Sequence, residues 1–429
     1  MSDRPTPSRS RSLSRRWRVP AHYLQAGERF DGEAILEETR GRVGLLLWQC
    51  ERDVRLWAGS GRDERQQLFS AGAAARCRET LESLGDELSS IAAPIRALAG
   101  MLEHPGEISP DVVMLACRRI SQWAEKRGAG ATALTFAQAG ALAQPASAPS
   151  AYRVGRLARR AGQSGRAEGW LNRSIVLARQ ARDWDTYAAS YSGLGNVNLS
   201  RGNLPAAERC QMKALRIAVQ HEIPIRAGAA LHDLFVIAAE AEQADRAMSY
   251  ARDAFARYPE TSKRRAALAH DVALFWMEQG NFRSAVPVLR AAWSRLERDQ
   301  QVIGLANVAR AAGATDDGEG YELYRRLARR ELERPGAGEP HPGVLLNLAR
   351  GAASLGRWDE SRELLREATA AAAAQKQHKI SFEAEALLHA IDGDQAIAAE
   401  RHSVTSPAAD EFAGEVANGL EALEPVMAG

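Results

Sequence analysis

The chain has 429 residues, of which 45% are hydrophobic and 26% charged, a balance typical of a folded protein rather than a wholly disordered one. Its 56 Lys and Arg against 54 Asp and Glu leave a net charge of +2, which argues against a protein whose main role is to neutralise nucleic-acid phosphates. The four cysteines include no Cys-x-x-Cys pair, and no apolar run approaches the roughly 20 residues that cross a bilayer, so we expect a cytoplasmic protein without a disulfide framework or zinc ribbon.

The two ends of the chain carry opposite charge. Residues 1–20 are rich in Ser, Pro and Arg without apolar periodicity, which predicts a disordered basic arm. Residues 392–429 are acidic and carry an apolar stripe at steps of four and three residues: Phe412, Val416, Leu420 and Leu423. This stripe predicts a helix that caps the last repeat, a disordered tail, or a helix that folds back onto the basic entrance of a groove as a tethered competitor.

Residues 21–110 form an N-terminal region of unknown role that is expected to be helical. Apolar periodicity predicts three helices there, over residues 45–59, 68–84 and 91–102. Pro94 should kink the third of them. Ser109-Pro110-Asp111 then marks the start of the next helix, because it supplies a hydroxyl cap, a proline at the first position and an acid in the first turn.

From about Met114 onward, a large residue followed by a small one recurs at steps of 34, 40, 40, 38, 33 and 43 residues. The second residue of each pair is, in order, Ser121, Gly155, Gly195, Phe235, Ala273, Ala306 and Ala349. A period in this range with two helices per unit predicts a helical solenoid, because small residues let helix axes approach to roughly 8–10 Å. Gly202 and Gly280 are expected to end first helices, and Pro145 and Pro259 second helices.

This pattern resembles the tetratricopeptide repeat over about Met114 to Gln375, and its steps near 40 are similar to the longer repeats of the kinesin-light-chain and LGN kind. The resemblance implies an all-α, right-handed superhelical solenoid of about seven helix pairs. Regular repeats are expected over residues 111–300, and degenerate repeats with a last helix over residues 301–391. In the degenerate part, Gly318 stands where the family has alanine, and Tyr321 lies out of register.

No enzyme motif emerges from the sequence, which lacks a His-Glu-x-x-His pair, a phosphate loop, a Gly-x-Ser-x-Gly elbow and a dinucleotide fingerprint. We therefore expect no catalysis, no cofactor and no metal. His232-Asp233 and His270-Asp271 occupy the same place in consecutive repeats. They could line a groove, join neighbouring repeats, have no role, or bind metal, although a spacing of roughly 8–10 Å is long for shared ligation of one ion.

The resemblance also implies that the first helix of each unit lines a concave surface. The candidate groove residues are Arg118, Gln122, Tyr152, Arg156, Arg159, Arg160, Asn196, His232 and His270. Asn196 matches the family's asparagine that hydrogen-bonds the backbone of an extended peptide, and an amide suits this role because it offers a donor and an acceptor. The three arginines from Arg156 to Arg160 would form a positive wall for carboxylates. The alternative is an exposed, charged helix face without a ligand.

The sequence therefore predicts a non-catalytic scaffold or adaptor that binds an extended acidic segment of another protein or peptide. The alternative is a regulatory sensor that acts on transcription through residues 21–110. No helix-turn-helix is evident there, and nucleic acid is not an expected partner. The oligomeric state stays open.

Overall fold

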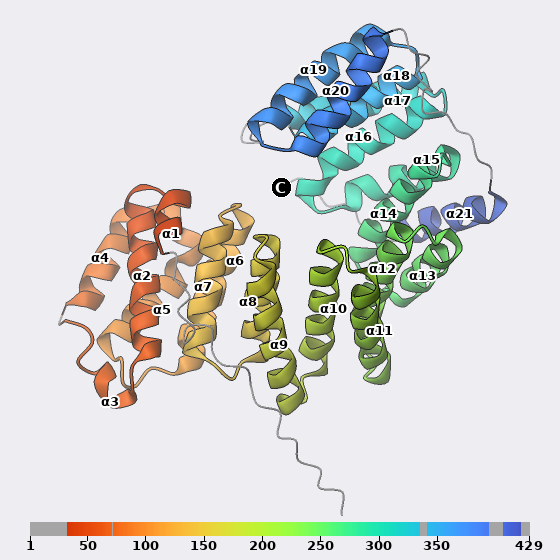
Figure 1. Ribbon diagram of the computed structural model, residues 1–429. Helices are drawn as coiled ribbons and strands as arrows, with labels where there is room; N and C mark the ends of the chain where they lie inside the picture. Colours follow the sequence, from red (N-terminus) through yellow and green to blue (C-terminus); the bar gives the residue numbers. More distant parts are fainter. Residues whose placement is uncertain (1–31, 71, 335–340, 394–405, 422–429) are drawn as a thin grey trace, which may run out of the picture. The chain divides into compact units, whose positions relative to one another are not determined.

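The computed structural model describes residues 32–70, 72–334, 341–393 and 406–421. Within these residues every regular element is a helix and no strand is present, which confirms the predicted all-α class (Figure 1). The chain divides into two compact units, Met1–Arg226 and Ala227–Gly429. The predicted basic arm and Leu423 lie outside the described residues. None of the described helices combines the length and apolarity that crossing a membrane requires.

Unit 1 begins with a set of N-terminal helices and continues with helix pairs. Its described helices are α1 (Glu33–Glu38), α2 (Gly41–Gly59), α3 (Arg62–Arg65), α4 (Ala73–Leu84), the 3₁₀ helix η2 (Gly85–Ile91), α5 (Ala92–Glu103), α6 (Pro110–Lys126), α7 (Gly130–Ala143), α8 (Ala148–Arg160), α9 (Ser164–Ala181), α10 (Trp184–Ser200), α11 (Leu204–Gln220) and the start of α12 (Pro224–Glu240).

Two of the expectations for the N-terminal helices need correction. The predicted helix over 45–59 is confirmed as α2, but the second helix begins at Ala73 rather than 68, because Gly72 adopts a left-handed conformation with φ of 89°. Pro94 is the third residue of α5. A proline in the first turn removes no intrahelical hydrogen bond, so the expected kink has no cause.

The start of α6 is as predicted. The Ser109 side chain accepts a hydrogen bond from the backbone N–H of Asp111, and Pro110 is the first helical residue. The hydroxyl therefore satisfies one of the N–H groups that a helix start leaves without a partner.

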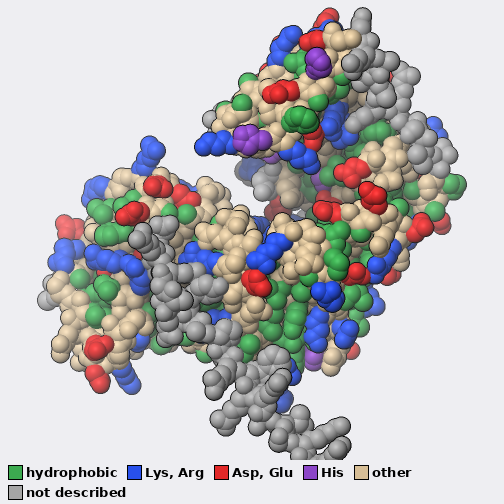
Figure 2. All heavy atoms as spheres, viewed as in Figure 1, with side chains coloured by type: hydrophobic (Ala, Val, Ile, Leu, Met, Phe, Trp, Pro, Cys, Tyr) green, Lys and Arg blue, Asp and Glu red, His purple; other side chains and the backbone are tan. Residues whose placement is uncertain are grey.

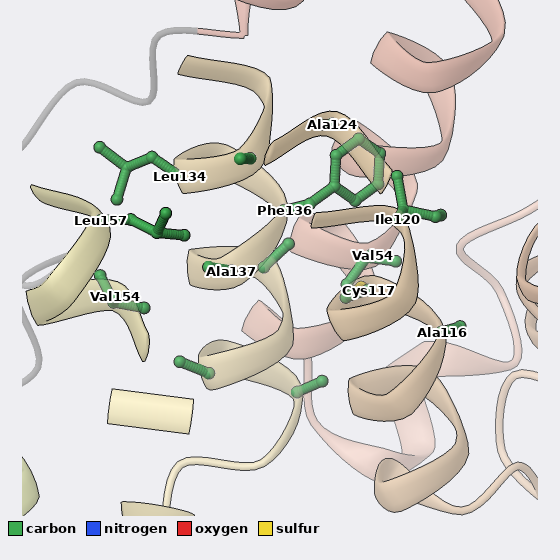
Figure 3. Packing of buried hydrophobic residues seen from close by; sticks show 14 of the residues in the cluster. Val54, Ala116, Cys117, Ile120, Ala124, Leu134, Phe136, Ala137, Val154 and Leu157 are labelled. Atoms are coloured by element: carbon green, nitrogen blue, oxygen red, sulfur yellow. The ribbon is translucent and has the colours of Figure 1, made fainter. Parts of the chain in front are cut away.

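The N-terminal helices share one hydrophobic core with the first repeats. Val54 of α2 lies against Ile120 of α6 and Phe136 of α7, and Leu157 of α8 continues the same cluster (Figure 3). All four side chains are buried. Residues 32–103 are thus packed onto the repeats of unit 1 through apolar contact rather than held apart from them.

Glu38 fixes α1 to the first repeat by capping another helix. Its carboxylate accepts hydrogen bonds from the backbone N–H groups of Ala131 and Thr132, at 2.8 and 2.7 Å. These residues begin α7, which has no cap from the side chain of its own N-cap residue, Ala129. A carboxylate at a helix start both satisfies free N–H groups and complements the helix dipole.

Replacing Glu38 by alanine should therefore destabilise unit 1 by about 1–2 kcal/mol, because two N–H groups of α7 lose a charged acceptor. Hydrogen exchange in the first turn of α7 and urea denaturation would measure the effect. Glu37→Ala is the matched control, since Glu37 is exposed one position earlier in the same helix. Equal stability of the two variants would contradict this account of the cap.

The positions that carry the sequence repeat are all buried in the first helices of consecutive pairs. They lie in α6, α8, α10 and α12, and in α14, α16 and α18 of unit 2: Ser121, Gly155, Gly195, Phe235, Ala273, Ala306 and Ala349. A Cβ added at Gly155 would lie 2.7 Å from Leu171 Cγ and 3.2 Å from the Ala167 carbonyl oxygen of α9. The small residue is therefore needed for the close approach of the two helices, as predicted.

Unit 2 continues the helix pairs from within α12. Its remaining described helices are α13 (Ala244–Arg257), α14 (Arg264–Glu278), α15 (Phe282–Ala292), the 3₁₀ helix η3 (Trp293–Arg295), α16 (Arg298–Ala314), α17 (Gly318–Leu332), α18 (Pro342–Ser354), α19 (Trp358–Ala374), α20 (His378–Asp392) and α21 (Pro407–Glu421).

The predicted helix ends are confirmed in both units. Gly202 and Gly280 have φ of 73° and 75° just after α10 and α14. Pro145 and Pro259 follow the ends of α7 and α13 at a distance of two residues. The left-handed glycines permit the tight turn between the two helices of a pair, and each proline follows the end of a pair's second helix.

The last described helix, α21, neither caps the last repeat nor lies at the basic entrance of a groove, the two places expected for a helix with the acidic stripe. In unit 2, α21 packs against α14 and α15 rather than on the final helices α18–α20 (Figure 1). Phe412, Val416 and Leu420 are buried in this contact, so the stripe does form one face of a helix.

Candidate functional site

A pocket of about 500 Å³ opens in unit 1 between the first helices of the repeats. Its wall is built from α6, α7, α8, the start of α10 and the first turn of α12. The charged and aromatic side chains that line it include Arg118, Tyr152, Arg153, Arg156, Asp185 and Arg226. Arginine predominates because α6, α8 and α12 each supply at least one guanidinium group, whereas α10 supplies Asp185.

Glu125 organises the arginines on one side of the pocket. Its carboxylate accepts hydrogen bonds from Arg153, Arg156 and Arg160, at 3.0, 2.7 and 2.7 Å. Burial would raise the pKa of Glu125, but the three guanidinium groups outweigh burial and lower that pKa below its ordinary value. Arg153 also donates from Nε to Ser121 Oγ, at 3.1 Å. The side chains are therefore held in place before any ligand binds.

A second ion pair fixes the opposite side of the pocket. Arg226 donates from Nε and Nη2 to the two carboxylate oxygens of Asp185, each at 2.8 Å. The hydrogen bonds from Arg226 lower the pKa of Asp185, and those to Asp185 raise the pKa of Arg226. This forked geometry is the one in which a guanidinium and a carboxylate bind most specifically.

The pocket keeps an excess of positive charge after these pairs are counted. Arg160 and the four lining arginines stand against Glu125, Asp183 and Asp185, so 5 − 3 leaves +2. Arg118 has no ion pair with any residue that the structure describes, and its side chain is exposed. A guanidinium without a partner, next to others that are already oriented, is an arrangement that attracts carboxylates.

The structure brings together only some of the residues proposed for the groove. Arg118, Tyr152 and Arg156 line the pocket, and Arg160 joins them through Glu125. Gln122, Arg159 and Asn196 are not part of the lining. Asn196 Oδ1 lies 3.3 Å from Gln211 Nε2, from which it accepts a hydrogen bond, so this amide already has a partner in α11.

Sequence reasoning missed Arg153, Asp185 and Arg226. Counting positions from Gly155 placed Arg153 outside the inward face, although it lies three residues before Arg156 on the same helix side. Asp185 and Arg226 are 41 residues apart, which is close to the repeat step of 40. Opposite charges separated by one repeat, each in the first turn of a first helix, were the signal that could have found this pair.

The two predicted histidines lie in unit 2 and join neighbouring repeats. His232 Nε2 lies 2.9 Å from Asp271 Oδ2, and His270 Nδ1 lies 3.4 Å from Asp271 Oδ1. Asn307 donates to His270 Nε2 at 2.9 Å. Burial acts against it, but the hydrogen bonds from the two histidines hold the pKa of Asp271 well below its usual range.

This polar chain extends through Asn307 and Asn347, which hydrogen-bond to each other at 2.8 Å. It therefore connects α12, α14, α16 and α18, the first helices of four consecutive repeats. Among the described residues, no group of three or more His, Cys, Asp or Glu side chains is placed to hold a metal ion. Of the four roles considered for His232 and His270, contact between neighbouring repeats is therefore the one that these hydrogen bonds support directly.

Charged side chains of both signs are mixed on the surface in view. Figure 2 shows Lys and Arg interspersed with Asp and Glu on the visible face of each unit, without a broad basic area.

The helical repeats correspond to a known family. Residues 147–218, which contain nearly all of α8 to α11, match the model of the tetratricopeptide repeat. The chain therefore contains tetratricopeptide repeats, as the resemblance in its sequence predicted. This fold suggests a scaffold for protein–protein interaction. No curated protein matches the chain significantly.

Several solved structures of helical repeat proteins are similar at low identity. BtubC (BKLC) from P. vanneervenii is 16% identical over 52% of this chain and 91% of its own, with a TM-score of 0.39. A Rap protein complexed with competence and sporulation factor is 11% identical over 80% and 98%, with a TM-score of 0.41. The TPR2AB domain of yeast Sti1 in complex with pHSP90 is 14% identical over 65% and 98%, with a TM-score of 0.27. None of these likenesses bears on what this chain binds.

Proposed function

We propose that the chain is a non-catalytic interaction scaffold that binds an extended acidic segment of a partner protein in the pocket of unit 1. The observation that carries this proposal is the set of four arginines, three of which Glu125 and Asp185 hold in position while Arg118 is left without an ion pair among the described residues. Carboxylates of the partner would accept hydrogen bonds from Arg118 and from the remaining N–H groups of Arg153 and Arg156. Because these side chains are already ordered, binding sacrifices little of their rotamer freedom.

Tyr152 and Arg226 would define the other edge of the bound segment. Tyr152 contributes a half-buried aromatic ring with a hydroxyl group, and Arg226 fixes the first turn of α12 against α10. Gln122, Arg159 and Asn196 remain candidates for contacts beyond the pocket, where a longer segment would continue along α6, α8 and α10. His232 and His270 have contacts within unit 2 and are not part of this proposal.

The test uses the full chain and short synthetic peptides rich in Asp and Glu, together with the same peptides carrying Asn and Gln. The wild-type chain should bind members of the acidic set and not their amide counterparts. The double variant Arg118→Ala with Arg156→Ala should bind the selected peptides about 100-fold more weakly, since two charge-assisted contacts of roughly 1.5 kcal/mol each total about 3 kcal/mol. Fluorescence anisotropy at two salt concentrations would measure both affinity and its electrostatic part.

Arg119→Ala is the matched control for this experiment. Arg119 is the residue next to Arg118 in α6, is exposed, and does not line the pocket. It should leave peptide affinity unchanged. Equal binding by the double variant and by Arg119→Ala, or equal binding of acidic and amide peptides, would refute the pocket as the binding site. Asn196→Ala then tests separately whether the bound segment reaches the middle of α10.

A further inference from the structure

The helix that carries the acidic stripe, α21, packs onto earlier helices of unit 2. This surface is neither the end of the last repeat nor the basic entrance of a groove. There, α21 packs against α14 and α15 (Figure 1), and Arg252 of α13 hydrogen-bonds to its start. Its buried face consists of Ala409, Phe412, Ala413, Val416 and Leu420. We call the surface of α13–α15 under this face the α21 groove.

Phe412 is the anchor of the contact. Its ring meets Phe255 of α13 and Trp276 of α14 edge to face, with centroids 6.2 Å apart in both cases. The guanidinium of Arg252 lies 4.5 Å from the centre of the same ring. Aromatic pairs of this geometry and a cation over the ring both add to the apolar burial, so the groove contains a pocket suited to one aromatic side chain.

The start of α21 is held by polar contacts. Arg252 donates to the carbonyl oxygen of Ala408 at 2.7 Å, and Ser284 Oγ of α15 donates to Asp410 Oδ1 at 2.5 Å. Between Pro407 and Glu421 the helix has four acids and no Lys or Arg. Arg252 and Arg265 lie in the groove and carry the opposite charge, which complements that of an acidic helix.

Arg265 is incompletely satisfied by α21. It is only 9% exposed, its guanidinium stacks 4.0 Å from the centre of the Phe255 ring, and its Nε has no hydrogen-bond partner among the described residues. The backbone of α21 covers it at Gly419, where an added Cβ would lie 3.6 Å from Arg265 Nη2. Burial lowers the pKa of Arg265, and the negative charge of Glu415 in α21 acts in the opposite direction. A helix with a carboxylate that hydrogen-bonds to Arg265 Nε would add a charge-assisted contact to those that α21 makes.

A hollow of about 510 Å³ lies beside the start of α21. Met248 and Arg252 of α13, Trp276 of α14 and Ala408 line it, together with Asp245 of α13.

From these features we infer that the α21 groove is a docking site for an acidic amphipathic helix of a partner protein, and that α21 occupies it as an exchangeable internal ligand. The partner helix would carry an aromatic residue at the place of Phe412, aliphatic residues four and eight positions later, and a carboxylate within reach of Arg265. This surface is distinct from the unit 1 pocket, and the inference does not depend on the function proposed for that pocket.

Because α21 belongs to the same chain, it competes at a high effective concentration with any partner helix. The experiment therefore weakens α21 in the full chain by Phe412→Ala and adds a labelled synthetic peptide with the wild-type sequence of residues 406–421. Peptide binding to this variant should be at least tenfold tighter than to the wild-type chain. Phe382→Ala is the matched control, since Phe382 is 74% exposed on α20 of the same unit. That control should bind the peptide as weakly as the wild type.

A peptide that itself carries Phe412→Ala should bind at least tenfold more weakly to the Phe412→Ala chain, because the aromatic anchor is lost. If the chain variant loses helicity, Asp410→Ala is the second variant. It removes the hydrogen bond to Ser284 without opening a cavity, and it should also increase peptide binding. Equal peptide affinity of all chains, or no binding to a folded Phe412→Ala chain, would overturn the inference. So would exchange of α21 between two copies, seen as a dimer of the wild-type chain, because the occupant would then be a second copy.

Discussion

Gly313→Ala is expected to destabilise unit 2 by about 3 kcal/mol, because the new methyl group would collide with backbone that cannot move independently. An ideal Cβ at Gly313 of α16 would lie 2.4 Å from the carbonyl oxygen of Gly351 and 2.9 Å from its C and Cα atoms, all in α18. Alanine favours a helix over glycine by about 1 kcal/mol, which the collision exceeds. Hydrogen exchange of the amides in α16 and α18, together with urea denaturation, would measure the loss.

Gly318→Ala is the control for this prediction. Gly318 begins α17 of the same repeat, and a Cβ there would meet only Arg357 Nη2, at an ordinary contact distance of 3.7 Å. This change also installs the alanine that the family has at that position. It should alter stability by less than about 0.5 kcal/mol. Similar losses for both glycines would show that the backbone contact between α16 and α18 is not the cause.

This repeat also shows how far the sequence pattern could lead. The seven pair positions predicted the first helices of the repeats, because burial of the same helix position against a neighbouring helix imposes a periodic constraint that the sequence displays. Six of these residues are small, and the seventh is Phe235. Gly313, however, stands seven residues after Ala306, where the pattern predicts a helix end. The helix continues to Ala314, and Asp316 takes the left-handed conformation instead, with φ of 61°. Gly313 allows the close approach of α18. The local pattern could not distinguish a glycine in this role from a glycine in a turn.

Tyr321 is a related case. Its place out of register suggested a degenerate repeat, yet its ring is fully buried against Gly351, where an added Cβ would lie 2.9 Å from it. The hydroxyl lies 3.0 Å from Glu360 Oε1. The large ring of Tyr321 in α17 fills the space that the absent side chain of Gly351 leaves in α18, 30 residues later in the sequence. Such compensation depends on tertiary packing and has no signature at a fixed spacing.

The candidate site was predictable only in part for a similar reason. The helical face of α8 gave Tyr152 and Arg156, and the equivalent face of α6 gave Arg118. The ion pairs that order these arginines connect different repeats, as Glu125 does with Arg153. The position of a charged residue within its own helix does not reveal which charge it meets in a neighbouring helix. Comparing positions one repeat apart does reveal such pairs, as with Asp185 and Arg226. The position of α21 had no comparable signal, because its stripe predicts a buried face but not the surface that buries it.

Glu51 is a buried acid whose ionisation should make the stability of unit 1 depend on pH. It lies in α2 with no exposed surface, and neither carboxylate oxygen has a hydrogen-bond partner among the described residues. Arg55 Nε is 3.7 Å from Oε1, too far for a hydrogen bond. Burial raises the pKa of Glu51 from 4.5 to about 7, although the charge of Arg55 acts in the opposite direction. In the unfolded chain the carboxyl has its ordinary pKa.

The sign of the effect follows from proton binding. Between about pH 4.5 and 7 the unfolded chain has released the proton while the folded chain retains it, so the folded state loses stability as the pH rises through this range. Below this range the two states bind the proton equally, and above it the full penalty is present. A shift of this size corresponds to about 3 kcal/mol at pH 8.

Glu51→Gln removes the ionisation and keeps the shape of the side chain. Its stability relative to the wild type should therefore increase by about 2–3 kcal/mol between pH 5 and pH 8. The comparison of two pH values cancels any constant cost of burying the amide. Glu82→Gln, at an exposed position of α4, should show no such increase. Hydrogen exchange in α2 during urea denaturation at both pH values is the measurement. A difference that stays constant with pH would mean that Glu51 ionises freely in the folded chain, and that water or a rearranged cation reaches it between α2 and the repeats.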